Sequence, residues 1–178
     1  MSSDKANSTE LRLNQLWNHM GPAPAGTGNG QRVTVFSSSD QLISSVTDVT
    51  VTGLSVTVAA GAYRVHAKVT WVQTTGAFAQ AIGFTGPATS HVRIPYQDYK
   101  VGAGPGTDPF GTGILTTLPG GASTSAFAAG VDCYSDFDGI VVFTAGGTLS
   151  VVAHASASGT FSVRSYSFMD VESAGQTT

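Results

Sequence analysis

The sequence predicts an all-β protein: an antiparallel β-sandwich of the jelly-roll type with a short N-terminal helix. Residues 63–71 alternate apolar and polar side chains, which is the period-two pattern of a half-buried strand. Similar runs recur between Gly, Asp and Ser turn signals, as in antiparallel sandwiches. The strand predicted over 62–73 is longer than is usual in immunoglobulin-like modules and suits a jelly roll better.

The N-terminal segment 1–20 contains the predicted helix, over residues 7–20. Asn7 can cap it, with Glu10 reaching back from three residues on. At roughly 14 residues such a helix is marginal alone in water. Its apolar stripe is therefore expected to pack on the sandwich, on sister helices of an oligomer or on a host surface. The stripe supplies four candidate anchoring residues, Leu13, Leu16, Trp17 and Met20.

Residues 21–31 are predicted to form a Gly/Pro linker, because prolines stiffen its start and glycines loosen its end. The β-sandwich is expected over 32–172, followed by a tail over 173–178. Eight to ten strands are predicted, some cores merging or failing, with approximate cores at 32–37, 41–46, 54–58, 62–73, 78–85, 90–95, 113–118, 124–131, 138–144, 147–155 and 160–171. Candidate inward side chains are Tyr63, Val65, Val69, Trp71, Ile82, Phe84, Ile140, Val142, Leu149, Val151, Phe161 and Val163.

The segment 96–113 is rich in Gly and Pro and is predicted to be a long exposed loop. Loops of this length are often functional, so its aromatic residues Tyr96, Tyr99 and Phe110 are candidates for a contact surface. The alternative is a connection whose aromatic side chains fold back onto the edge of the sandwich.

Composition restricts the class of protein. A chain of 178 residues with 41% hydrophobic content makes one domain, and its 11% of charged residues is low for a soluble monomer. Part of its surface is therefore expected to be buried against copies of itself or a partner. The net charge of −3 argues against nucleic-acid binding, and neither a signal peptide nor a stretch of ~20 apolar residues is found, so no membrane partner is expected.

No catalytic, cofactor or metal site is predicted, and the protein is not expected to be an enzyme. The sequence contains no Gly-x-Ser-x-Gly elbow. The spacing of His66, His91 and His154 does not indicate a zinc site, and Asp136 and Asp138 are expected in a turn before a strand. Cys133 is the one cysteine, which suits a buried free thiol in a reducing cytoplasm.

Three segments carry a family resemblance: 60–71 (Ala-Gly-Ala-Tyr-Arg-Val-His-Ala-Lys-Val-Thr-Trp), 82–88 (Ile-Gly-Phe-Thr-Gly-Pro-Ala) and 138–149, which ends in Gly-Gly-Thr-Leu. They resemble structural proteins of tailed bacteriophages that infect actinobacteria and, more distantly, the trimeric jelly rolls of the tumour necrosis factor and C1q type. The resemblance covers roughly residues 32–171 and rests mostly on strand and turn motifs. It implies a compact homotrimer and no fixed catalytic motif.

Two functions follow from this resemblance. The first is a capsid decoration or minor capsid protein, assembled in the host cytoplasm and held on the capsid exterior by its N-terminal segment, with the phage major capsid protein as partner. The second is a tail-fibre or baseplate module whose 96–110 segment binds a host surface glycan. The short segment before the sandwich favours decoration. A polysaccharide-degrading enzyme is a weaker third possibility.

Overall fold

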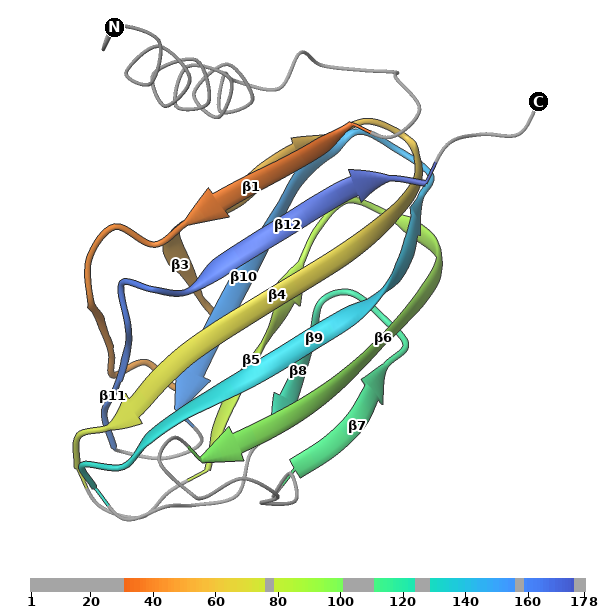
Figure 1. The fold of residues 1–178 in the computed structure, drawn as a ribbon. Coiled ribbons are helices and arrows are strands. Elements are labelled where there is room, and N and C mark those ends of the chain that lie inside the picture. The colour runs from red at the N-terminus through yellow and green to blue at the C-terminus, as the bar shows by residue number, and fades with distance from the viewer. Residues whose placement is uncertain (1–30, 76–78, 101–110, 124–128, 156–158, 175–178) are drawn as a thin grey trace, which may run out of the picture.

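The structure is a computed structural model that describes residues 31–75, 79–100, 111–123, 129–155 and 159–174. Every regular element in this part of the chain is a strand (Figure 1). The strands are β1 (Arg32–Phe36), β2 (Gln41–Ile43), β3 (Val49–Val58), β4 (Gly61–Gln73), β5 (Gln80–Thr85), β6 (Thr89–Lys100), β7 (Gly111–Leu115), β8 (Gly120–Ser123), β9 (Asp132–Phe143), β10 (Gly147–Ala155), β11 (Phe161–Val163) and β12 (Phe168–Ser173). The predicted helix over 7–20 lies outside the described residues. No described helix is long and apolar enough to span a membrane.

The strands form two antiparallel sheets packed face to face. One sheet has the order β1-β12-β4-β9-β6-β7, with the short strands β2 and β11 beside it, and the other has the order β3-β10-β5-β8. Without β2, β11 and the β6–β7 hairpin, eight strands remain, four in each sheet. Their order is that of a jelly roll, in which the chain passes back and forth between two four-stranded sheets. The β6–β7 hairpin extends the first sheet beyond β9 (Figure 1).

The long alternating segment that predicted the fold is the centre of the first sheet. β4 pairs with β12 on one side and with β9 on the other, and the β4–β9 pairing runs continuously from Gly61–Phe143 to Val72–Asp132. Its odd-numbered residues Val65, Ala67, Val69 and Trp71 are fully buried. The alternation therefore fixes which side of the central strand faces the core.

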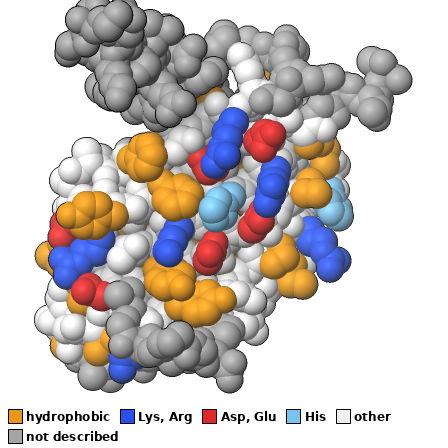
Figure 2. Space-filling model, viewed as in Figure 1, with side chains coloured by type: hydrophobic (Ala, Val, Ile, Leu, Met, Phe, Trp, Pro, Cys, Tyr) orange, Lys and Arg blue, Asp and Glu red, His pale blue; other side chains and the backbone are white. Residues whose placement is uncertain are grey.

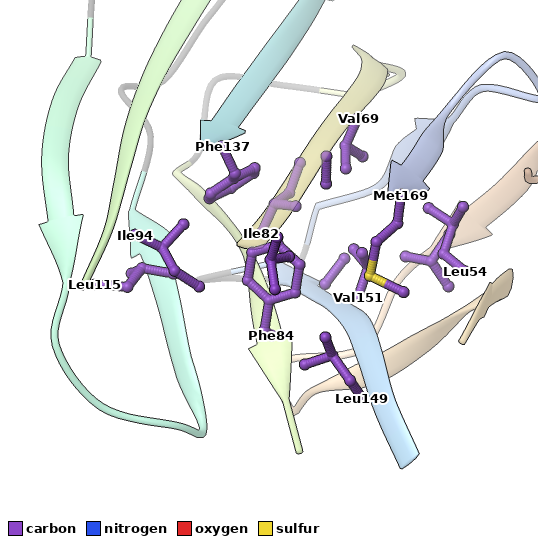
Figure 3. Close-up of a cluster of buried hydrophobic side chains, with 14 of the residues drawn as sticks. Leu54, Val69, Ile82, Phe84, Ile94, Leu115, Phe137, Leu149, Val151 and Met169 are labelled. Carbon is purple, nitrogen blue, oxygen red and sulfur yellow. The ribbon is translucent and has the colours of Figure 1, made fainter. Parts of the chain in front are cut away.

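The core lies between the sheets and is formed by their inward-facing apolar side chains (Figure 3). Phe84 of β5 meets Phe137 of β9 edge to face at 5.2 Å between ring centroids, which joins the two sheets. Most predicted inward side chains are confirmed as buried: Val65, Val69, Trp71, Ile82, Phe84, Leu149, Val151, Phe161 and Val163. Tyr63 is partly buried and packs against this core.

Two predicted inward residues are wrong. Ile140 is 51% exposed and Val142 shares its side of β9, whereas Val141 and Phe143 point inward. The apolar run 140–143 does not by itself set the phase of the strand. Pairing along the whole of β9 sets it, and Phe137 then points into the core.

Two predicted non-strand segments are also wrong. Asp136 and Asp138 lie in the middle of β9, because this strand is paired on both sides by β4 and β6. The predicted exposed loop begins later than expected, since β6 continues to Lys100 and β7 starts at Gly111. Residues 101–110, including Phe110, lie outside the described residues, and so do residues 124–128 of the strand predicted over 124–131.

Candidate functional site

The outer side of the first sheet carries most of the described charges. Cross-strand partners share a side of a sheet, so the strand registers place four cations and four acids together. We call this surface the charged face; its charged members are Arg32, Arg64, Lys68, Arg93, Asp136, Asp138, Asp170 and Glu172 (Figure 2). Positive and negative side chains therefore balance on it.

Several of these charges are paired within the chain. Arg64 makes two hydrogen bonds to Asp138, at 2.9 and 2.7 Å, and this pairing lowers the pKa of the Asp138 carboxyl. Asp170, nearly buried, accepts hydrogen bonds from Arg32 and Thr34. Charges paired in this way cost less to cover with another surface than unpaired charges would.

His66 of β4 lies on the charged face between Asp138 of β9 and Asp170 of β12, its partners in register. Its Nε2 is 3.3 Å from Asp136 and its Nδ1 is 3.8 Å from Asp170, so carboxylates from both neighbouring strands flank it. The ring packs edge to face on Phe168 at 5.3 Å. The sequence did not indicate this cluster, because its members come from three separate strands.

Large apolar side chains are exposed among these charges. Phe36 is 53%, Ile114 49% and Ile140 51% exposed, and each lies on the outer side of a strand of the first sheet. Paired charges interspersed with exposed apolar groups are a surface suited to contact with another protein.

A trough with a volume of about 490 Å³ lies on the β7 side of this face. It is lined by His66, Pro95, Tyr96, Gln97, Thr112, Gly113, Ile114, Asp136 and Asp138. Beyond it, Tyr99 of β6 and Tyr134 of β9 stack with their centroids 4.9 Å apart, and the Lys68 ammonium is 3.9 Å from the Tyr134 ring centroid.

The outer side of the second sheet differs in chemistry. Its strands β3, β10, β5 and β8 contain no Asp, Glu, Lys or Arg. Thr and Ser supply much of this surface, for example Thr50, Thr52 and Thr57 of β3. The lack of charged residues is therefore most pronounced in the strands of the second sheet.

The three strand histidines do not converge. His66 is on β4, His91 is an exposed residue of β6, and His154 of β10 lies in the other sheet, 2.7 Å from Asp48. Among the described residues no group of three or more His, Cys, Asp or Glu side chains is placed to hold a metal ion. Cys133 is buried, and burial raises its thiol pKa to about 12.

The predicted contact residues fall in different places. Tyr96 is on β6, half-buried, with its ring 5.8 Å from that of Phe137, so it folds onto the sandwich. Tyr99 is also on β6 and is half-buried. Phe110 and all four anchoring candidates, Leu13, Leu16, Trp17 and Met20, lie outside the described residues.

No protein-family model and no curated protein matches the sequence. The solved structures that resemble the fold include Eiger TNF from S. frugiperda, which is 13% identical over 85% of this chain and 96% of that chain, with a TM-score of 0.44. The structure of infectious bursal disease virus Gx strain is 17% identical over 88% of this chain and 39% of that chain, with a TM-score of 0.42. The tripod (BppUct-A-L) from the baseplate of bacteriophage Tuc2009 is 12% identical over 97% of this chain and 94% of that chain, with a TM-score of 0.27. Similarity at this level carries no information on function.

Proposed function

We propose that the chain is a non-enzymatic structural protein of a tailed-bacteriophage virion. In its specific form it is a homotrimeric capsid decoration protein, held on the capsid exterior through residues 1–20. The observation that supports it best is the charged face, which combines exposed apolar side chains with charges of which several already have partners in the chain.

Self-association is the first part of this proposal. The charged face carries four cations and four acids, so a second copy can approach it without net repulsion. Phe36, Ile114 and Ile140 supply apolar area at such a contact.

Changing Ile140 tests where the copies meet. Ile140→Asp places a carboxylate between Arg64 and Arg93, its partners in register, so the sandwich is expected to stay folded while the contact is lost. Thr57→Asp adds the same charge to an exposed position of the second sheet. Sedimentation equilibrium should give a monomer for Ile140→Asp and a trimer for Thr57→Asp. Monomeric wild type would contradict self-association, and the reverse pattern would move the contact to the second sheet.

Attachment through the N-terminal segment is the second part. In a predicted helix over 7–20, Leu16 lies on the apolar stripe and Asn18 on the opposite side. Leu16→Asp is expected to weaken saturable co-sedimentation with undecorated capsids by roughly 10-fold or more, because a buried Leu is worth about 1.5–3 kcal/mol. Asn18→Asp, which adds the same charge, should bind like wild type. Equal binding by both variants and by a chain lacking residues 1–20 would exclude this anchor.

The second candidate function is host recognition at a tail or baseplate. It is favoured by the Tyr99–Tyr134 stack beside the polar trough, since aromatic rings and polar groups together are suited to a host surface glycan. The same co-sedimentation assay with host cells separates the two functions. Binding to cells alone, lost in Tyr99→Ala, would replace decoration by host recognition.

A further inference from the structure

Asp98 is a buried acid without a charged partner among the described residues. It is 0% exposed, and neither carboxyl oxygen makes a hydrogen bond of normal geometry within the described chain, although the nearby Ser135 hydroxyl weakly favours the charged form. Every other aspartate of the described residues lies within 4 Å of an Arg or His side chain: Asp40, Asp48, Asp132, Asp136, Asp138 and Asp170. A buried carboxylate of this kind is expensive unless it is protonated.

The described strands on either side of Asp98 offer no countercharge. Across the β6–β9 pair it faces Ser135, whose hydroxyl accepts a hydrogen bond from Trp71 of β4 at 3.2 Å. Across the β6–β7 pair it faces Gly111, where an added Cβ would lie 2.6 Å from its Oδ2.

The titratable groups beside Asp98 are Tyr96 on its own strand and Cys133 on β9. Burial raises the pKa of both groups, and the charge of Asp98 raises it a little further. Lys100, two residues along β6, is exposed and makes no ion pair with Asp98 in the described chain. Asp98 therefore fits this position best in its neutral, protonated form.

We propose that Asp98 is a proton-controlled latch for the β6–β7 hairpin, closed when the carboxyl is protonated and loosened when it ionises. The hairpin is the part of the sheet that can respond, because β7 is an edge strand that, among the described strands, pairs only with β6. When β7 moves away from β6, water can reach Asp98 while the β4–β9 pairing in the centre of the sheet is kept.

The direction of the pH effect follows from burial, which raises the pKa of Asp98 from 3.8 to about 6, while Ser135 acts in the opposite and smaller direction. Between these two values the folded state holds the proton more strongly than the unfolded chain. Closure is therefore strongest in acid and weakens as pH rises through about 6. From pH 4.5 to 7.5 the closing equilibrium should fall roughly 30-fold.

Hydrogen exchange of the full chain tests the latch. After correction for intrinsic exchange rates, protection of those β7 amides that donate hydrogen bonds to β6, which are alternate residues of this edge strand, should fall roughly 30-fold from pH 4.5 to 7.5 in wild type. Asp98→Asn, which mimics the protonated acid, should keep its protection. Asp132→Asn removes an exposed acid near one end of the same sheet and should behave like wild type.

Two results would overturn the proposal: an unchanged protection in wild type, or the same loss in Asp98→Asn. A carboxyl titration of wild type by carbon-13 NMR gives an independent measurement that does not depend on the variant folding. A midpoint near 6 for Asp98 supports the latch, and a midpoint near 4 excludes it.

Discussion

Phe137→Ala is expected to lower the free energy of unfolding by about 3–5 kcal/mol, the range for loss of a buried aromatic side chain. Phe137 is fully buried and touches both layers of the sandwich: its ring packs on Phe84 of the second sheet at 5.2 Å and on Tyr96 of its own sheet at 5.8 Å. Removing it leaves a cavity between rings that cannot easily close. Urea unfolding followed by tryptophan fluorescence measures the loss.

Phe36→Ala is the matched control, because it removes the same side chain from the outer side of the first sheet. Phe36 is 53% exposed, and its ring contact is with Phe168 at 6.3 Å. Its replacement should cost less than about 1 kcal/mol in a monomeric sample. Equal losses in the two variants would show that Phe137 does not join the sheets.

Gly139→Ala is expected to destabilise the sandwich by about 3 kcal/mol, at the upper end of the cost of overpacking. An added Cβ would lie 2.2 Å from the carbonyl oxygen of Arg93 and 2.4 Å from the Cα of Ile94. Both contacts are with the backbone of β6, so the strand itself must move away from β9. Glycine is therefore required at this position by the close approach of two strands.

Gly146→Ala makes the same chemical change where the nearest atom, the carbonyl oxygen of Val58, is 3.3 Å from the added Cβ. It should cost less than about 1 kcal/mol by urea unfolding. A Gly139→Ala protein as stable as this control would mean that β6 and β9 can separate freely.

The two faces of the sandwich explain the unusual composition of the chain. The strands of the second sheet have no charged residue, while the first sheet holds four cations and four acids on its outer side. Some of these charges form salt bridges between neighbouring strands, as Arg64 does with Asp138. The low charge content of the chain thus arises in part because the strands of the second sheet contain no charged residue.

The sequence by itself determined the class of fold and much of the core. Period-two alternation depends only on neighbouring residues, so the inward positions of β4, including Val65 and Trp71, were readable before any pairing was known. Glycine-containing turns likewise located the start of β10 at Gly147. These features are local, and local physics is enough to predict them.

Tertiary structure alone decided the rest. Pairing with β4 and β6 made Asp136 and Asp138 strand residues and turned Ile140 outward, although local sequence favoured a turn and an inward side chain. The His66 cluster and the buried position of Asp98 also depend on strands distant in sequence. Charge pairing and burial are set by these long-range neighbours, which no short window of sequence contains.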